Sequence, residues 1–172
     1  MRAGRIVLVP DLRGLGHPKL YATSMRAMLV GRTMAGMQTT DLLAAFDYLA
    51  SRPDVDAKHI GIFAKGNTAA VALYAAALEP RIEKVACEGG PISYLDIVRA
   101  PVHDEIADLI VPGVLKDFDL PEVAAAIAPR PVWLVNPRIQ SGIREEYKPA
   151  ENFRSVERPT GSTFEKVYKD WL

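Results

Sequence analysis

The sequence has a single cysteine, no long apolar run and no excess of either charge. One cysteine, Cys87, allows no disulfide within the chain, which fits a reducing compartment. No stretch reaches the ~18 consecutive apolar residues that a membrane-spanning helix needs. Arg5 leads into only five apolar residues before Asp11, too few for the apolar region of a signal peptide. We therefore expect a cytoplasmic protein with no membrane partner, unless the natural chain is longer.

The positive and negative charges are balanced, and histidine and cysteine, two common metal ligands, are scarce. Lys and Arg together number 21, as do Asp and Glu, so the formal net charge is zero. Because phosphate binding needs a basic excess or patch, this balance argues against nucleic acid as a partner. The three histidines and one cysteine form no cluster with metal-ligand spacing. The loop with Gly14, Gly16 and His17 lacks the phosphate-binding glycine motifs. We expect neither a metal nor another cofactor.

Hydrophobic patterning predicts alternating strands and helices. The expected strands are the short apolar runs Arg5–Pro10, His59–Ala64, Lys84–Cys87 and Pro131–Asn136. Helical spacing predicts helices over Thr40–Ser51, Asn67–Leu78 and Leu120–Ala128, and less regular ones over Tyr21–Ala35, Ala150–Ser155 and Phe164–Leu172. Either Thr39 or Thr40 is placed to cap the first of these. The order predicts an α/β fold, a parallel sheet with flanking helices, in one domain over residues 1–172 with an irregular excursion over 93–119.

Chemistry in such a fold is expected where the strands end. Ligands of parallel α/β sheets bind at the carboxyl edge. The segments that reach this edge offer a set of possible cleft-lining residues: Asp11, Arg13, His17, Glu88, Asn136 and Arg138.

The segment IGIFAKGNT is the most informative of these. A strand passes at once into an alanine-rich helix, which is the setting of the G-x-S-x-G nucleophile elbow. Aligned on the strand and helix, the serine position falls on Gly66. We interpret Lys65, Gly66 and Asn67 as a degenerate elbow and expect a tight turn with Gly66 at positive φ, which glycine adopts without steric cost.

Several motifs together resemble one enzyme superfamily. They are DLRGLG, TTDLLAAFDYLASRPDVD, HIGIFAKGN, ALYAAALEPRI and DLPEVAAAIAPRPVWLVNP. In order and spacing they resemble the α/β-hydrolases, in particular acetyl xylan esterases and prolyl-oligopeptidase-like esterases, over about Arg5 to Pro137. The resemblance implies acyl transfer by a serine, a histidine base and an orienting aspartate. Against that family the present sequence is truncated.

The triad that the resemblance implies is not matched here. Gly66 stands at the serine position, Arg138 to Gly142 holds no carboxylate, and no histidine follows His103. The leading hypothesis is a degenerate, non-catalytic hydrolase-like domain, the accessory or interaction part of a larger esterase-like protein. The alternative is a carboxylic-ester hydrolase of acetyl xylan esterase type with an unrecognised or partner-supplied nucleophile. A third hypothesis is a module that binds a small ligand, an ester or a carbohydrate, in the cleft that an active member of the family would use for catalysis.

Other reactive side chains have simpler interpretations. His59 opens a strand at the opposite edge, Lys65 points to solvent, and Cys87 is a small buried residue. A set formed by Ser93, His103 and a nearby aspartate is conceivable, but triads are recognised by geometry that a sequence does not contain.

The strands carry apolar residues on both faces, so both faces need a cover. In the fold that the resemblance implies, a strand lies between the one adjoining DLRG and the nucleophile strand, and that strand would precede Met1. About eight exposed side chains at ~1.5–3 kcal/mol each would exceed a typical net stability of ~5–15 kcal/mol. We expect self-association or a partner domain to cover the second face, ahead of a fold-back of Ala150–Leu172, because Pro159 and Gly161 interrupt that segment.

Overall fold

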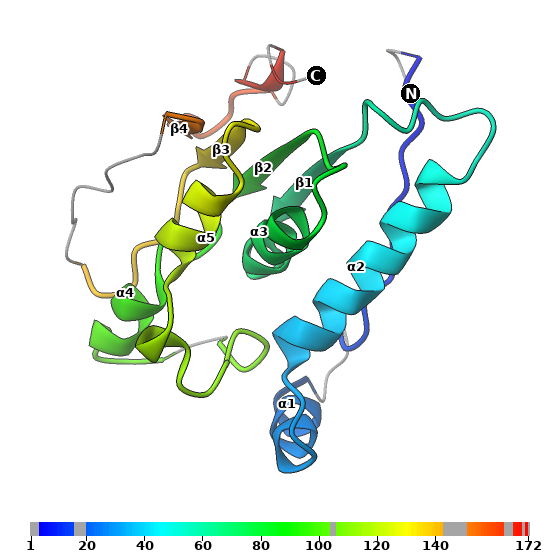
Figure 1. The fold of residues 1–172 in the computed structure, drawn as a ribbon. Helices are drawn as coiled ribbons and strands as arrows, with labels where there is room; N and C mark the ends of the chain where they lie inside the picture. The colour runs from blue at the N-terminus through cyan, green and yellow to red at the C-terminus, as the bar shows by residue number, and fades with distance from the viewer. Residues whose placement is uncertain are drawn as a thin grey trace.

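The computed structural model forms one parallel sheet with helices against it (Figure 1). It describes residues 4–15, 20–103, 106–142, 151–163, 167–169 and 171. The sheet contains β1 (Gly61–Lys65), β2 (Lys84–Glu88), β3 (Val132–Val135) and β4 (Phe153–Val156) in that spatial order, all parallel. The predicted α/β class is confirmed. Whether residues 1–172 are one complete domain stays a prediction.

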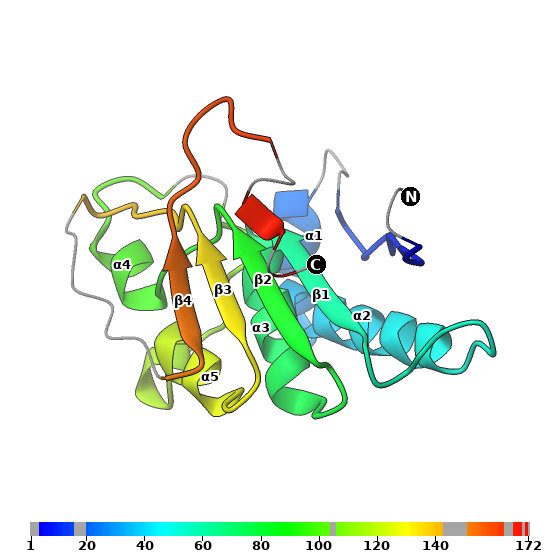
Figure 2. The ribbon, with the colours of Figure 1, turned by 90° about the horizontal axis from the view of Figure 1, so that it is seen from above.

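Three helices cover one face of the sheet (Figure 2). They are α2 (Met34–Ala50), α3 (Thr68–Leu78) and α5 (Leu120–Ala126). The structure also describes two further helices, α1 (Leu20–Leu29) and α4 (Tyr94–Arg99), and the 3₁₀ turn η1 (Val114–Lys116). The core on this face joins Phe46 of α2, Leu73 of α3 and Val123 of α5 to the sheet residues Val85 and Leu134. Among the described residues, no helix has the length and apolarity needed to cross a membrane.

The ends of the helices follow capping chemistry. α2 begins six residues before the predicted Thr40, because the hydroxyl of Thr33 accepts the N–H of Gly36 at 3.1 Å. The prediction of Thr39 or Thr40 as the cap is wrong, since both hydroxyls donate to the carbonyl four residues earlier. The helix predicted over Tyr21–Ala35 is divided between α1 and the start of α2, with Gly31 at φ of 69° between them. α5 begins in a capping box formed by Asp119 and Glu122.

The prediction of a strand over Arg5–Pro10 is wrong. These residues pair with no strand in the part of the chain that the structure describes, where β1 is the edge of the sheet. The C-terminal end of the segment is instead attached to α2, where Arg13 forms an ion pair with Asp41 and Gln38 donates to the Arg13 carbonyl at 3.1 Å. The apolar side chains of Ile6, Val7, Leu8 and Val9 are therefore left 45%, 71%, 37% and 85% exposed.

The fourth strand comes from a segment expected to be helical. Residues Phe153–Val156 lie beside β3, whereas a helix was predicted over Ala150–Ser155. Asn152 fixes the start of this strand, because its backbone carbonyl accepts the Val132 N–H at 2.9 Å and its side-chain amide donates to the Arg130 carbonyl at 3.0 Å. Strand pairing of this kind outweighs a weak local preference, since packing dominates strand formation.

The second face of the sheet is covered in part by the C-terminal segment (Figure 2). Tyr168 and Trp171 pack against Ala86, Trp133 and Val135. Of the helix predicted over Phe164–Leu172, the described residues 167 and 168 are helical. Over β2 and β3 this face is therefore covered by the chain's own C-terminal segment, which we expected less than self-association or a partner domain. Association with another chain stays a prediction.

Because Trp171 packs against this face of the sheet, truncation of its side chain should destabilise the protein. Trp171 is 8% exposed, its ring lies 6.4 Å from that of Tyr168, and the Lys84 ammonium lies 5.2 Å from its centre. We expect Trp171→Ala to lower the free energy of unfolding by about 3 kcal/mol, as for other buried aromatic truncations. Urea unfolding measures this, with Tyr21→Ala, an aromatic residue 69% exposed, as the control. Equal small effects of both substitutions would contradict the packing described.

Candidate functional site

The turn between β1 and α3 has the predicted geometry. β1 ends at Lys65, α3 begins at Thr68, and Gly66 between them has φ of 62°. The Gly66 N–H donates to the Glu88 carbonyl at 2.8 Å and so extends the parallel ladder into the turn. The Thr68 hydroxyl donates to the Lys65 carbonyl at 2.9 Å and closes the turn from the helix side. The tight turn and the positive φ of Gly66 are confirmed.

Gly66 has free space in front of it, whereas its neighbour Gly90 does not. A Cβ built on Gly66 meets no atom within 4 Å, so a side chain at this position would project into the open. A Cβ on Gly90 would lie 2.3 Å from the Cβ of Ala69. Glycine and alanine here allow the loop after β2 to approach the start of α3. A side chain at position 66 would therefore be sterically accommodated, whereas glycine itself carries no reactive group.

Asn67 links the turn to two other segments. Its side-chain N–H donates to the Asp108 carboxylate at 2.8 Å, and its side-chain oxygen Oδ1 accepts from the Arg138 guanidinium at 2.6 Å. Asp108 belongs to the 93–119 excursion and is 5% exposed. Arg138 follows β3, and its backbone N–H donates to the Gly90 carbonyl at 2.7 Å. Hydrogen bonds thus occupy the polar groups beside Gly66 and hold three segments together.

Asp108 was not recognised in the sequence. It stands inside the apolar run IADLI. A single carboxylate within such a run is the local sign of a buried, paired group, because a buried charge needs a partner. Of the predicted cleft residues that the structure describes, Arg138 alone binds Asn67 or Asp108 through its side chain.

A second buried aspartate holds the loop after β3. Asp96 on α4 is 7% exposed and accepts the backbone N–H groups of Gln140 at 2.7 Å and Ser141 at 3.1 Å, together with the Ser141 hydroxyl. The Ser93 hydroxyl caps α4 by accepting the Asp96 N–H at 2.8 Å. Among the described residues, Ser93 shares no hydrogen bond with His103, which is exposed. These groups therefore build the loop and do not form a triad.

Glu88 is paired rather than free. It ends β2 and is 6% exposed, and its carboxylate accepts the Tyr168 hydroxyl at 2.8 Å and the Arg158 guanidinium. Burial by itself raises the pKa of this carboxyl group. The hydrogen bonds from Tyr168 and Arg158 outweigh burial and hold the pKa of Glu88 below its ordinary value. Glu88 thus ties the C-terminal segment to the sheet as a carboxylate.

The other predicted residues lie apart from the turn or have structural partners. Arg13 is paired with Asp41, and Asp11 is exposed. Asn136, at φ of 45°, exchanges two hydrogen bonds of 2.8 Å with the backbone of Arg158. His17 lies outside the described residues.

Nucleophiles near the turn are protected or engaged. Cys87 is 1% exposed, and burial raises the pKa of its thiol to about 12, so it is protonated at neutral pH. This agrees with the interpretation of Cys87 as a small buried residue. Within the described ranges, no three His, Cys, Asp or Glu side chains are grouped so that they could hold a metal ion. The described arrangement around Gly66 offers an open turn without an activated hydroxyl or thiol.

Comparison with known proteins agrees with the fold. "Putative hydrolase YtaP" of Bacillus subtilis (strain 168) is 29% identical over 150 residues, covering 86% of this chain and 47% of that protein. The chain thus spans about half the length of this curated relative. A solved structure, "Crystal structure of hypothetical protein PA2218 from Pseudomonas Aeruginosa", has a TM-score of 0.50 at 14% identity, over 77% of this chain and 63% of that one. This second likeness concerns the fold alone. No family model matches the chain. The chain has a hydrolase-like α/β fold.

The pairing of Glu88 predicts a pH-dependent contribution to stability. Its folded-state pKa lies below the ordinary 4.5, so the contribution is complete above pH 4.5 and is lost as the pH falls through the folded-state pKa. We expect Glu88→Gln to lower the free energy of unfolding by about 2 kcal/mol at pH 7. The difference from the parent should shrink below pH 4.5. Urea unfolding at pH 7, 5 and 3.5 measures it, with the exposed Glu151→Gln as control. A difference independent of pH would refute this role.

Proposed function

We propose that this chain is a hydrolase-like domain that does not itself hydrolyse esters and serves as the accessory or interaction part of a larger esterase-like protein. One observation carries the proposal: Gly66, at φ of 62° and with open space before it, stands where a strand-to-helix turn would present a nucleophile. The turn keeps its backbone geometry while lacking the hydroxyl on which acyl transfer depends.

The surroundings of the turn support the same proposal. Asn67 and Arg138 bind each other, and Asn67 also binds Asp108, so these groups are engaged in holding the turn. A serine needs an adjacent base to become a nucleophile, and the nearby Thr68 hydroxyl donates to a backbone carbonyl instead. The similarity to a hydrolase that is about twice as long favours a role within a larger protein.

Hydrolysis of p-nitrophenyl acetate tests this function. We expect no turnover above background from the parent chain, from Gly66→Ser, or from Gly66→Ala as the size-matched control. Both variants should fold, because the space is open, with a destabilisation of about 1–2 kcal/mol from a side chain at positive φ.

Saturable turnover by the parent would overturn the proposal in favour of an ester hydrolase with an unrecognised nucleophile. Turnover by Gly66→Ser alone would show that a working base is still present.

We also propose that the chain associates with a second copy through its β1 side. Two features lie there: the outer edge of β1, which no described strand borders, and the Ile6–Val9 segment, where Val7 and Val9 are 71% and 85% exposed. Unpaired strand edges and exposed apolar runs both favour association between chains. In Figure 2 the N-terminal segment lies on the β1 side of the sheet.

Light scattering of the purified chain tests this association. We expect a dimer or larger species in the parent and a shift toward monomer in the double variant Val7→Lys, Val9→Lys. The matched control is Leu29→Lys, Val30→Lys, because these residues at the C-terminal end of α1 are 85% and 74% exposed. A folded parent that is monomeric at high concentration would refute the proposed association.

A further inference from the structure

The excursion between β2 and β3 encloses a cavity that the network around Gly66 does not use. Its volume is about 360 Å³. The lining comes from α4, from residues 106–111 and from η1, and its apolar members include Ile97, Val98, Ile106, Leu109, Ile110 and Leu115. Cavities of about 300–1,000 Å³ with such linings are typical of small-molecule sites.

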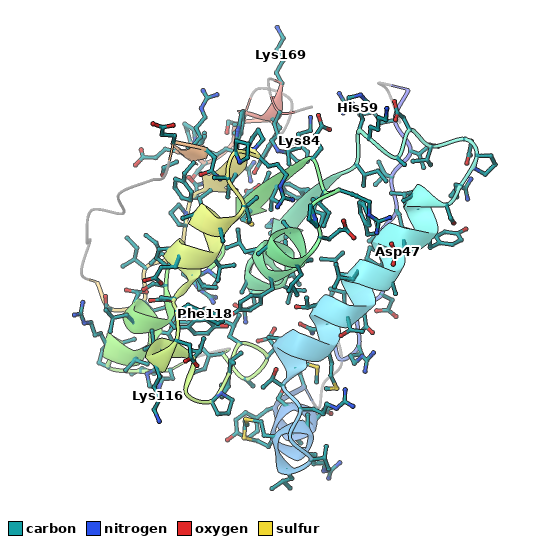
Figure 3. The ribbon with its side chains drawn as sticks, in the orientation of Figure 1. Asp47, His59, Lys84, Lys116, Phe118 and Lys169 are labelled. Carbon is teal, nitrogen blue, oxygen red and sulfur yellow. The ribbon has the colours of Figure 1, made fainter. Side chains whose placement is uncertain are left out.

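Three lining residues carry polar side-chain groups: Tyr94, His103 and Lys116. The Tyr94 hydroxyl accepts from Tyr74 at 2.9 Å and is thereby engaged. His103 and Lys116, the basic residues of the lining, are both exposed. Lys116 lies in Figure 3 at the margin of the molecule beside α4. The cavity therefore combines apolar lining residues with two exposed basic ones, His103 and Lys116.

The mouth of the cavity leaves large apolar side chains in contact with water. Val98 and Leu115 in the lining are 62% and 41% exposed, and Val102 beside them is 73% exposed. Leu109, deeper in the lining, is only 2% exposed. An open apolar mouth that continues into a buried apolar wall fits a chain that enters end-on and keeps its head group outside.

We propose that this cavity binds a medium-chain carboxylate, with the hydrocarbon tail inside and the carboxylate at Lys116 and His103. The apolar lining selects a tail without polar atoms, because a buried polar group without a partner is unfavourable. The Lys116 ammonium selects an anionic head group over a neutral one. The site is separate from Gly66 and needs no nucleophile, so it stands whether or not the chain hydrolyses esters.

The first experiment titrates the purified chain with hexanoate, octanoate, decanoate and decanol by calorimetry. Each added methylene that enters the cavity should raise the affinity roughly fourfold. Decanoate should bind saturably at one site and more tightly than decanol. No saturable binding of decanoate at millimolar concentration, or equal binding of decanol, would overturn the proposal.

Variants locate the site. Lys116→Gln should weaken decanoate binding several-fold without changing decanol binding. Lys169→Gln is the matched control, since this exposed lysine lies at the opposite end of the molecule in Figure 3. Equal effects of the two substitutions would refute the assigned head-group position.

A further pair tests the mouth without disturbing the core. Val98 is exposed, so Val98→Asp and Val98→Lys should both fold. The first should weaken decanoate binding and the second should preserve or strengthen it. Ile110→Trp, which fills the cavity, should abolish binding of both decanoate and decanol. Binding unaffected by all three substitutions would place the ligand elsewhere and overturn the proposal.

Discussion

The close approach of α3 to the sheet is the constraint on which the rest of the structure depends. Ala69, Ala72 and Ala76 are almost fully buried, and Gly90 has no room for a Cβ because Ala69 occupies that space. This small-residue contact fixes where α3 begins. The turn at Gly66 must then join β1 to the helix in two residues, which requires the positive φ. The position of Asn67, and through it those of Asp108 and Arg138, follows from the same contact.

The two faces of the sheet are stabilised by different means. The helix face is packed with alanine, leucine and valine from α2, α3 and α5. The other face uses aromatic rings: Phe63 lies edge-on to Tyr168 at 5.3 Å, and Tyr168 also binds Glu88. A buried carboxylate is favourable only when it is fully paired. The buried charge of Glu88 therefore depends on its partners in the C-terminal segment, and that segment in turn depends on the sheet for its packing.

Elements with strong local patterns could be predicted from the sequence, and elements defined by distant contacts could not. The alanine-rich run ending at Leu78 and the strand entering Gly66 have local signals, and both are present as expected. The apolar pattern of Arg5–Pro10 predicted a strand, but a strand forms only where a neighbouring strand pairs with it. Phe153–Val156 has such a neighbour in β3, although its own sequence did not predict a strand. Likewise, the role of Asp108 depends on contact with a residue 41 positions away. Such contacts are properties of the folded chain and are not encoded in any short window.

The central position of β2 has a consequence for how the molecule opens. β2 has a strand on each side, α3 on one face and the aromatic segment on the other, and its residues Val85, Ala86 and Cys87 are at most 1% exposed. Its amides can exchange with solvent only if several layers separate together, so β2 and α3 belong to the most slowly exchanging cooperative unit. Arg5–Pro10 and α1 have few buried contacts and can detach at little free-energy cost. The chain is therefore divided into a central unit that opens only as a whole and an N-terminal segment that can open by itself.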